Sequence, residues 1–560
     1  MRTLKTVSVV LFLVLGVTPL VAGDQNPTTL EQVVDRIILK EQQQNGRMKQ
    51  YAPLVETYIQ NLKPDAALGT VPNGDKYFIG RADLAKGVEL ISLSEGGGKG
   101  KKILSSIGGF FSFAMQYLPD GFLQMIYVDN SSFDRQHYQF DYVRREFAGE
   151  VRCLVFDVRP SKEAGKGRFL GRIWVEDQDY NIVRFNGGYT GSGHQSFYFH
   201  FDSWRTNVEP GLWLPSFVYS EESNMHYALN KRLQFKAQTR LWGYNLGRAG
   251  QEQELGKILI ESSAVHDNTQ TSNDLSPVQA QRTWDRQAES NVADRLERIG
   301  LLAPRGEVDK VLETVVNNLE VTNNLDIQPE VRCRVLLTST LESFTLGHTI
   351  VLSRGLVDVL PDEASLGVII AHELGHVVLG HRMDSQYAFF DRLLVDDKNT
   401  FRHFLFARDP NEETAASTKA IELLKNSPYK DQLGVAARFL QAMEQRHKEI
   451  PNLISPHLGD RVPANSILPS VTAEQADPNK PNQVVALPIG GRIKLDPWND
   501  HLEMLKSKPV GTVAEREKMP FEVTPFMPYL VRFGSDKTPA PVAAESKAPE
   551  TKPDETKKPQ

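Results

Sequence analysis

The amino-acid sequence predicts an α+β protein in which an antiparallel, β-rich N-terminal half precedes a mostly helical C-terminal half. Apolar and polar residues alternate in short runs between residues 153 and 201, as they do in antiparallel strands. Apolar residues between Leu366 and Val378 instead recur at helical spacing. With 560 residues, of which 40% are hydrophobic and 24% charged, the chain is long enough to bury cores in at least two domains.

Residues 1–23 have the parts of a secretory signal peptide. Arg2 and Lys5 precede an apolar run from Val7 to Leu15, and small residues stand before Asp24 at the expected cleavage site. We therefore expect a periplasmic or secreted protein. The residue directly after the expected cleavage site is Asp24 and not Cys, so we expect no lipid anchor. No later apolar stretch reaches roughly 18 residues, so we expect no transmembrane segment in the mature chain.

Residues 24–270 are predicted to form the β-rich domain. It begins with an amphipathic helix around Leu30 to Gln43. Two of its strands are expected to pair as a hairpin across the turn residues Asp177 to Tyr180. The predicted strands are Cys153–Pro160, Gly171–Glu176, Asn181–Phe185 and Phe197–Phe201.

Part of this domain resembles a known fold. The succession of Val158–Pro160, Gly171–Val175, Asp179–Arg184 and Trp213–Pro215 is similar to the half-barrel of envelope lipoprotein carriers, which holds acyl chains in a concave sheet. The resemblance implies an antiparallel half-barrel-like domain that binds a lipid or a lipoprotein. A plain β-rich interaction domain is the alternative, and both stay open.

Amino-acid composition predicts the remaining domain boundaries. Polar, turn-forming residues predict a linker at 271–290, followed by a domain with helical patterns at 291–470. Scattered apolar residues such as Trp498 predict a C-terminal arm at 471–533 that packs on the folded body. Residues 534–560 consist mainly of Pro, Lys, Glu, Ala and Thr, a composition that predicts disorder.

The two cysteines, Cys153 and Cys333, fit no zinc-thiolate spacing. A disulfide between them is one interpretation for an oxidising compartment. Two separate buried thiols are the other, because the cysteines fall in different predicted domains.

The run Ala371-His372-Glu373-Leu374-Gly375-His376 is the most informative feature of the sequence. A helix start at Pro361-Asp362-Glu363 places His372 and His376 on one buried helix, within about 40° of each other. Two imidazoles with this spacing can share one Zn²⁺. Three protein ligands would leave one position for a water whose pKa falls to about 7, and Glu373 would take its proton as a peptide carbonyl is attacked. A metal-free pair of core histidines is the alternative.

The third ligand must come from a separate segment. His381 lies five residues past His376, and an uninterrupted helix would rotate it about 140° away, so we expect it to face away from the metal. The longer motif with a third His is also absent, because Leu379 and Arg382 stand at its Gly and His positions.

The stretch from Glu342 to Leu356, with Leu360–Glu363 and the helix that follows, resembles gluzincins related to HtpX, the CAAX prenyl endopeptidase and the periplasmic assembly-enhancing protease. In these proteins an N-A-F-x-x-x-G-x-I-x-V-x-x-G-L strand lies beside the zinc helix. The likeness covers roughly residues 300–465 and implies a mostly helical zinc metallopeptidase domain with a small edge-strand sheet. The residues implied for substrate binding by β-augmentation are Phe344, Thr345, Leu346 and Gly347.

That family takes its third zinc ligand from an E-x-x-x-D pattern on a later helix. Aligning Ala420–Leu424 with that helix places Glu413 on the ligand and Ser417 on the Asp, while Glu412 is the rival ligand. The Asp would orient a zinc histidine, an effect of about 10- to 100-fold. Ser417 can accept one hydrogen bond but carries no charge. The implied ligands of one Zn²⁺ per chain are His372, His376 and Glu413.

A further likeness lies at Ser455–Val462, which resembles the family's S/T-H-P-x-x-x-x-R segment with shortened spacing. It implies that His457 donates a hydrogen bond to the tetrahedral oxyanion. It also implies that Arg461 holds the loop or a substrate carboxylate. An ordinary surface loop is the alternative for both residues.

The resemblance implies a secreted zinc-dependent metalloendopeptidase that cleaves polypeptides, with envelope or outer-membrane proteins as the expected substrates. Two alternatives stay open. One is a catalytically weak relative that serves as a chaperone or scaffold, which Ser417 favours. The other is a lipid or lipoprotein carrier that the peptidase half regulates. The net charge of −6 gives no reason to expect nucleic acid as a partner.

Overall fold

The computed structural model describes the chain in segments between residues 27 and 534. The described residues are 27, 29–66, 69–85, 89–92, 119–190, 199–227, 231–247, 276–381, 388, 406, 408–455, 458–461, 486–490, 492–505 and 521–534. The predicted signal peptide at 1–23 and nearly all of the predicted tail at 534–560 lie outside them.

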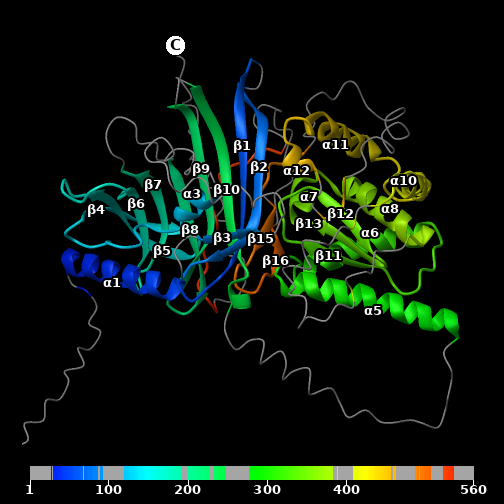
Figure 1. The fold of residues 1–560 in the computed structure, drawn as a ribbon, viewed down its shortest axis with the longest axis horizontal. Helices are drawn as coiled ribbons and strands as arrows, with labels where there is room; N and C mark the ends of the chain where they lie inside the picture. Colours follow the sequence, from blue (N-terminus) through cyan, green and yellow to red (C-terminus); the bar gives the residue numbers. More distant parts are fainter. Residues whose placement is uncertain are drawn as a thin grey trace, which may run out of the picture.

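An open ten-stranded antiparallel sheet forms the N-terminal half (Figure 1). Its strands lie in the order β3-β2-β1-β10-β9-β8-β7-β6-β5-β4, so all but the β1–β10 pair join neighbours in sequence. The strands are β1 (Leu54–Asp65), β2 (Gly69–Asp83), β3 (Glu89–Ser92), β4 (Tyr138–Ala148), β5 (Val151–Pro160), β6 (Phe169–Glu176), β7 (Ile182–Tyr189), β8 (Phe201–Glu209), β9 (Leu212–Tyr227) and β10 (Lys231–Trp242). The predicted α+β class, with an antiparallel N-terminal half, is confirmed.

Three of the four predicted strands correspond to β5, β6 and β7. The predicted hairpin is present, since β6 and β7 pair antiparallel across a turn in which Tyr180 takes a positive φ of 66°. The prediction at Phe197–Phe201 is wrong within the described residues, because β8 begins only at Phe201.

One face of this sheet is covered by α1 (Leu30–Met48) and α3 (Pro119–Gln124). Apolar side chains from both helices and from the sheet form one buried core. A buried ion pair fixes α1 to the sheet, because Arg205 of β8 donates to both carboxylate oxygens of Glu41, at 2.6 and 2.7 Å. The predicted N-terminal helix is thus part of the folded domain.

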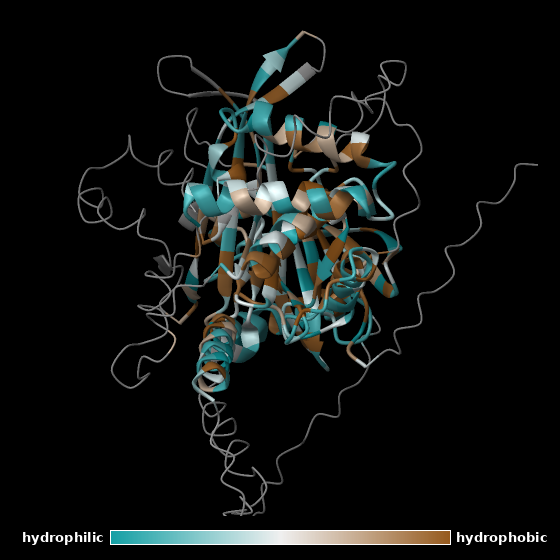
Figure 2. Cartoon of the chain, turned by 90° about the vertical axis from the view of Figure 1, so that its right-hand side faces the viewer, coloured by the Kyte–Doolittle hydropathy of each residue, from teal (hydrophilic) through white to brown (hydrophobic). Residues whose placement is uncertain are grey.

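The helical half contains a second, four-stranded sheet with the order β11-β13-β12-β14. Its elements are α5 (Pro277–Arg298), α6 (Glu307–Thr322), β11 (Arg332–Leu336), β12 (Glu342–Leu346), β13 (Thr349–Ser353), α7 (Arg354–Val359), α8 (Glu363–Leu379), α10 (Pro410–Lys425), α11 (Leu433–Arg446), α12 (Pro451–Ile454) and β14 (Asp460–Arg461). In Figure 2 this half faces the viewer, and hydrophilic and hydrophobic residues alternate along its helices. Because α8 packs against α6, α10 and α11, it lies at the centre of this half.

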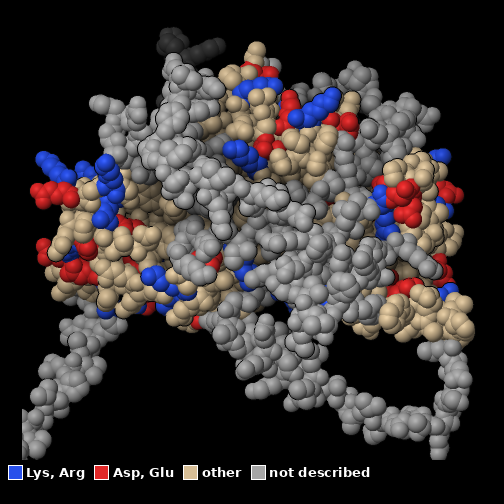
Figure 3. Space-filling model, in the orientation of Figure 1, with Lys and Arg blue, Asp and Glu red and all other residues tan. Residues whose placement is uncertain are grey.

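The opposite face of the large sheet shares its core with the helical half. One cluster of buried residues runs from Trp174, Trp204 and Phe217 of the sheet into the apolar faces of α6 and α8. The two halves therefore pack as one body. On the face drawn in Figure 3, acidic and basic residues of the described surface lie interspersed.

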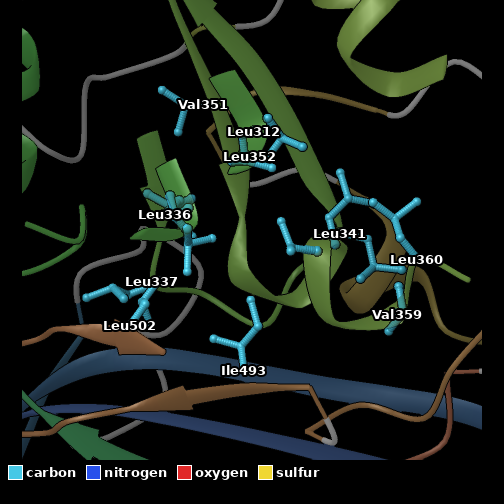
Figure 4. Packing of buried hydrophobic residues seen from close by; sticks show 14 of the residues in the cluster. Leu312, Leu336, Leu337, Leu341, Val351, Leu352, Val359, Leu360, Ile493 and Leu502 are labelled. Carbon is cyan, nitrogen blue, oxygen red and sulfur yellow. The ribbon is translucent and has the colours of Figure 1, made fainter. Parts of the chain in front are cut away.

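The described parts of the predicted C-terminal arm pack on this body. A 3₁₀ helix, η5 (Tyr244–Gly247), follows β10, and the arm adds a hairpin of β15 (Ile493–Leu495) and β16 (Leu502–Met504). Ile493 and Leu502 of this hairpin lie in the same cluster as Leu337 and Leu360 (Figure 4). Farther along, the carbonyl of Phe521 accepts a hydrogen bond from the Gln60 amide of β1, at 2.7 Å.

The predicted linker at 271–290 is wrong from residue 277 onward, because α5 begins there. Ser276 caps the helix, and Pro277 occupies the first turn, where its missing N–H costs nothing. The polar composition that suggested a linker belongs to a largely exposed helix, which buries only Ala288, Val292, Arg295 and Leu296.

Cys153 and Cys333 are separate buried thiols, so the disulfide interpretation is wrong. Burial raises the pKa of Cys153 to about 12 and also raises the pKa of Cys333. Both thiols therefore stay protonated at neutral pH. In the part of the chain that the structure describes, no helix is long and apolar enough to cross a membrane.

Two carboxylates of the large sheet hold the helical half in place. Glu56 of β1, 1% exposed, accepts hydrogen bonds from the backbone N–H and the hydroxyl of Ser339, both at 2.6 Å. It also faces Arg354 at 3.3 Å. Asp75 of β2 accepts two backbone N–H groups of α12, at 3.1 and 2.8 Å. Ser339 precedes β12 and α12 precedes β14, so the sheet anchors both of these strands.

We predict that Glu56→Gln destabilises the whole chain, because it leaves the buried Arg354 without its carboxylate. Removing one member of a buried ion pair costs about 3 to 5 kcal/mol of unfolding free energy. Asp141→Asn is the matched control, since Asp141 pairs with Arg159 in a pair whose side chains are 53% and 60% exposed. Urea unfolding should show a lower midpoint for Glu56→Gln alone. Equal midpoints for both variants would contradict the role of Glu56.

Candidate metal centre

The motif residues lie on α8, which begins where the sequence predicts. Asp362 caps it by accepting the N–H of Ser365 at 2.8 Å. His372, Glu373 and His376 are each 1% exposed. Buried polar groups need partners, so the surroundings of these three side chains decide what they can do.

Gly375, inside the motif, lets α10 approach α8 closely. A Cβ built at this position would lie 2.7 Å from the carbonyl oxygen of Ala416, closer than neighbouring backbone tolerates. α10 starts at Pro410 after the N-cap residue Asp409, so Glu413 lies in its first turn. The close contact therefore brings the start of α10 to the histidine pair.

Three ligand-type side chains converge between α8 and α10. His372 Nε2 and His376 Nε2 lie 3.2 Å apart. Glu413 Oε2 lies 3.2 Å from His372 Nε2, and Glu413 Oε1 lies 3.2 Å from His376 Nε2. Burial opposes the charge on Glu413, but hydrogen bonds with the two histidines outweigh it and lower the pKa of Glu413 to about 2. The carboxylate is therefore ionised at neutral pH.

This group fits Zn²⁺. Two imidazole nitrogens and one carboxylate are the ligand set of catalytic zinc sites that keep one position open. In the described residues, His372, His376 and Glu413 are the group whose ligand atoms, all within 4.8 Å of one another, could hold a metal ion. Glu373 adds a second observation: its buried Oε1 has no hydrogen-bond partner among the described residues. A buried carboxylate oxygen left in this way is costly unless it faces water or a ligand.

The other oxygen of Glu373 is held by β12. The hydroxyl of Thr345 donates to Glu373 Oε2 at 2.8 Å. The resemblance implies substrate binding through the backbone of this strand, while the Thr345 side chain, 1% exposed, contacts the expected general base. Thr345 thus fixes Oε2 of Glu373, while Oε1 remains available to accept a proton.

His381 adds no ligand atom to the group, as expected, but its ring lies against His376 instead of turning away from it, so the predicted orientation is wrong. α8 ends at Leu379, and Gly380 takes a left-handed conformation with φ 69°. The chain reverses there, and His381 Nδ1 lies 2.9 Å from His376 Nδ1. The prediction extended helical geometry past Gly380, although a glycine at this position commonly ends a helix. Burial and the neighbouring His376 lower the pKa of His381.

Ser417 lies where the resemblance placed an Asp. It is 2% exposed, and its Oγ lies 3.3 Å from His372 Nδ1. A hydroxyl thus stands beside the ring nitrogen of His372 that does not face Glu413. His457 lies outside the described residues. The backbone of Arg461 forms part of β14, and its side chain is outside the description.

The outer edge of the expected substrate strand is in contact with the chain itself. β14 pairs with β12 at Glu342 and Ser343. Arg408 donates to the Thr345 carbonyl at 3.1 Å. The Phe406 ring stacks on Phe344 with 4.7 Å between ring centroids. A substrate strand that paired with β12 along this edge would have to displace β14 and Arg408.

Two more of the β12 residues proposed for substrate binding are closed to solvent, whereas Gly347 is half-buried. Phe344 and Leu346 are 0% exposed, and Gly347 forms the turn between β12 and β13 with φ 58°. A Cβ at Gly347 would collide with the Glu289 carboxylate of α5. Sequence reasoning missed Arg408 and the contact of Thr345 with Glu373, because no local pattern connects the segments that these contacts join.

One stretch of the helical half is similar to a known protein family. Residues 304–402 match Peptidase family M48. The match spans α6, β11 to β13, α7 and α8, and therefore includes both motif histidines and Glu373. It supports a metallopeptidase of this zinc-dependent family, and it ends before Glu413.

Other comparisons add little. A solved structure of a LolA superfamily protein from Nitrosomonas europaea is similar at 11% sequence identity, over 37% of this chain and 90% of that one, with a TM-score of 0.19. A TM-score this low carries no argument about the N-terminal domain. No curated protein sequence matches the chain significantly.

We predict that Glu413→Gln lowers zinc occupancy far more than Glu412→Gln. Both residues lie in the first turn of α10, but the carboxylate of Glu413 is the one beside both histidine Nε2 atoms. Metal analysis of the two purified variants after dialysis measures the difference. Equal losses, or a loss only at Glu412, would show that Glu413 is not the ligand.

Proposed function

We propose that this protein is a zinc-dependent metalloendopeptidase. The observation that carries the proposal is the convergence of His372, His376 and Glu413 beside Glu373, whose Oε1 has no partner among the described residues. The M48 match over α8 supports the same reading. Zn²⁺ held by the three side chains would supply a Lewis acid that lowers the pKa of a water to about 7.

Glu373 is the general base in this proposal. Its free Oε1 takes the proton of the attacking water and then passes it to the leaving amine of the peptide. Thr345 holds Oε2, so the carboxylate keeps one orientation through both proton transfers. A fixed donor costs no reorganisation during the reaction, which is how active sites gain most from such contacts.

The proposed subfamily is that of HtpX-like and periplasmic assembly-enhancing proteases, and the proposed compartment is the periplasm or the exterior of the cell. The support lies in the signal-peptide pattern of residues 1–23 and in the strand sequence from Glu342 to Leu356. Envelope and outer-membrane proteins are the proposed substrates, since these are the polypeptides such an enzyme would meet there. Arg461 and His457 keep their proposed roles at the substrate.

A catalytically weak, chaperone-like protein is the second candidate. The observation that favours it is the outer edge of β12, whose backbone β14 and Arg408 already contact. A lipid or lipoprotein carrier has less support. The described residues on one face of the large sheet already pack against α1 and α3, so a lipid there would have to displace those helices.

We predict that Glu373→Gln abolishes peptide cleavage while zinc stays bound. The carboxylate acts as a base and is not among the three expected ligands, so the loss should be at least the roughly 10²- to 10⁴-fold typical of a missing general base. Cleavage of unfolded casein by the full chain, together with zinc content, measures both effects.

His372→Ala is the companion variant and should lose zinc and cleavage together. If Glu373→Gln cleaves casein as fast as the unmodified protein, the catalytic assignment is wrong. If the unmodified protein binds zinc but does not cleave, the chaperone-like candidate is favoured instead.

A further inference from the structure

The reversal of the chain after α8 places one more histidine at the metal centre. Gly380 donates its N–H to Val377 at 3.0 Å, and His381 donates its backbone N–H to the carbonyl of His376 at 3.1 Å. These two bonds, with the left-handed glycine between them, form a Schellman-type helix end. They hold the His381 ring against His376, with 5.0 Å between ring centroids.

Nδ1 of His376 and Nδ1 of His381 face each other, so one of them must donate a hydrogen bond and the other must accept it. His376 directs Nε2 to the convergence point with His372 and Glu413. A nitrogen that ligates a metal carries no proton, so the proton of a neutral His376 must be on Nδ1. That nitrogen lies 2.9 Å from His381 Nδ1, a normal hydrogen-bond distance. His381 Nδ1 must then be the acceptor.

We propose that His381 is a positioning residue for the metal centre: it accepts the Nδ1–H of His376 and so aims Nε2 of that ring at Zn²⁺. The inference rests on the proposed zinc-peptidase function. Metal-bound histidines almost always donate their second N–H to a carboxylate, a carbonyl or a water, which fixes the ring and raises its basicity. In this protein the imidazole of His381 is the acceptor instead.

The geometry also excludes a direct ligand role for His381 Nδ1. This atom lies against Nδ1 of His376, whereas the metal-facing atom of that ring is Nε2. The other zinc histidine has its own neutral partner, since Ser417 Oγ lies 3.3 Å from His372 Nδ1. Both ring orientations are thus set by uncharged groups, and Glu413 supplies the negative charge of the ligand set.

The test compares His381→Leu with His381→Asn in the full-length protein. Leucine keeps bulk but has no acceptor, whereas the side-chain oxygen of asparagine can stand where Nδ1 of histidine stands. We expect His381→Leu to weaken zinc binding by about 10- to 100-fold, the range for lost contacts to zinc histidines. His381→Asn should bind within a few-fold of the unmodified protein. Chelator competition measures the zinc affinity.

The control is His501→Leu, the same substitution at a half-buried histidine of the C-terminal arm. It should leave zinc affinity unchanged. Melting temperatures of the zinc-free forms separate positioning from folding, because a positioning role predicts that zinc-free His381→Leu melts like the zinc-free parent.

Three results would overturn the inference. The first is a His381→Leu variant that binds zinc as tightly as the parent. The second is an equal loss in His381→Leu and His381→Asn, which would show that the acceptor atom is not what matters. The third is a large drop in the melting temperature of zinc-free His381→Leu, which would show a structural role. A parent protein that binds no zinc would instead refute the proposed function itself, and the inference with it.

Discussion

The candidate metal centre depends on one close contact between two helices. Glu413 and the histidine pair come from segments about forty residues apart, and nothing covalent brings them together. The contact is possible because Gly375 has no side chain where α8 meets Ala416 of α10. Any larger residue would push α10 outward, and a displacement of about 1 Å is enough to spoil a catalytic arrangement. The glycine inside the histidine motif is therefore required for the packing of α10 on α8.

The large sheet is a structural part of the site as well as a neighbour. Glu56 and Asp75 reach across from adjacent strands and hold the segments that lead into β12 and β14. β12 in turn carries Thr345, which holds the carboxylate of Glu373. The large sheet is thus connected to the expected general base through these hydrogen bonds and through β12. Anything that shifts the sheet relative to the helical half would act on that base.

The sequence predicted those features that depend on local spacing. The α8 helix, its start at Asp362 and the pairing of His372 with His376 follow from periodicity and capping alone. The hairpin after Glu176 follows from its turn residues in the same way. Glu413 needed a different kind of information, because only the alignment with a known family selected it over Glu412.

Two of the wrong predictions, those for His381 and for residues 277–290, share a physical cause. His381 was placed by continuing an ideal helix, although Gly380 ends it, and residues 277–290 were assigned to a linker although Ser276 and Pro277 start a helix there. In both places a capping signal outweighed periodicity or composition. The contacts of Arg408 with β12 could not be predicted, because they join segments about sixty residues apart that no local pattern connects.

The most direct test of this account is X-ray absorption at the zinc edge of the purified full-length protein. A site made of His372, His376 and Glu413 predicts one zinc per chain with nitrogen and oxygen ligands only, at about 2.0 to 2.2 Å, and with the scattering pattern of two imidazoles. Absence of zinc would contradict this ligand set, and so would a sulfur ligand at about 2.3 Å, because both cysteines are buried free thiols and neither belongs to the ligand group.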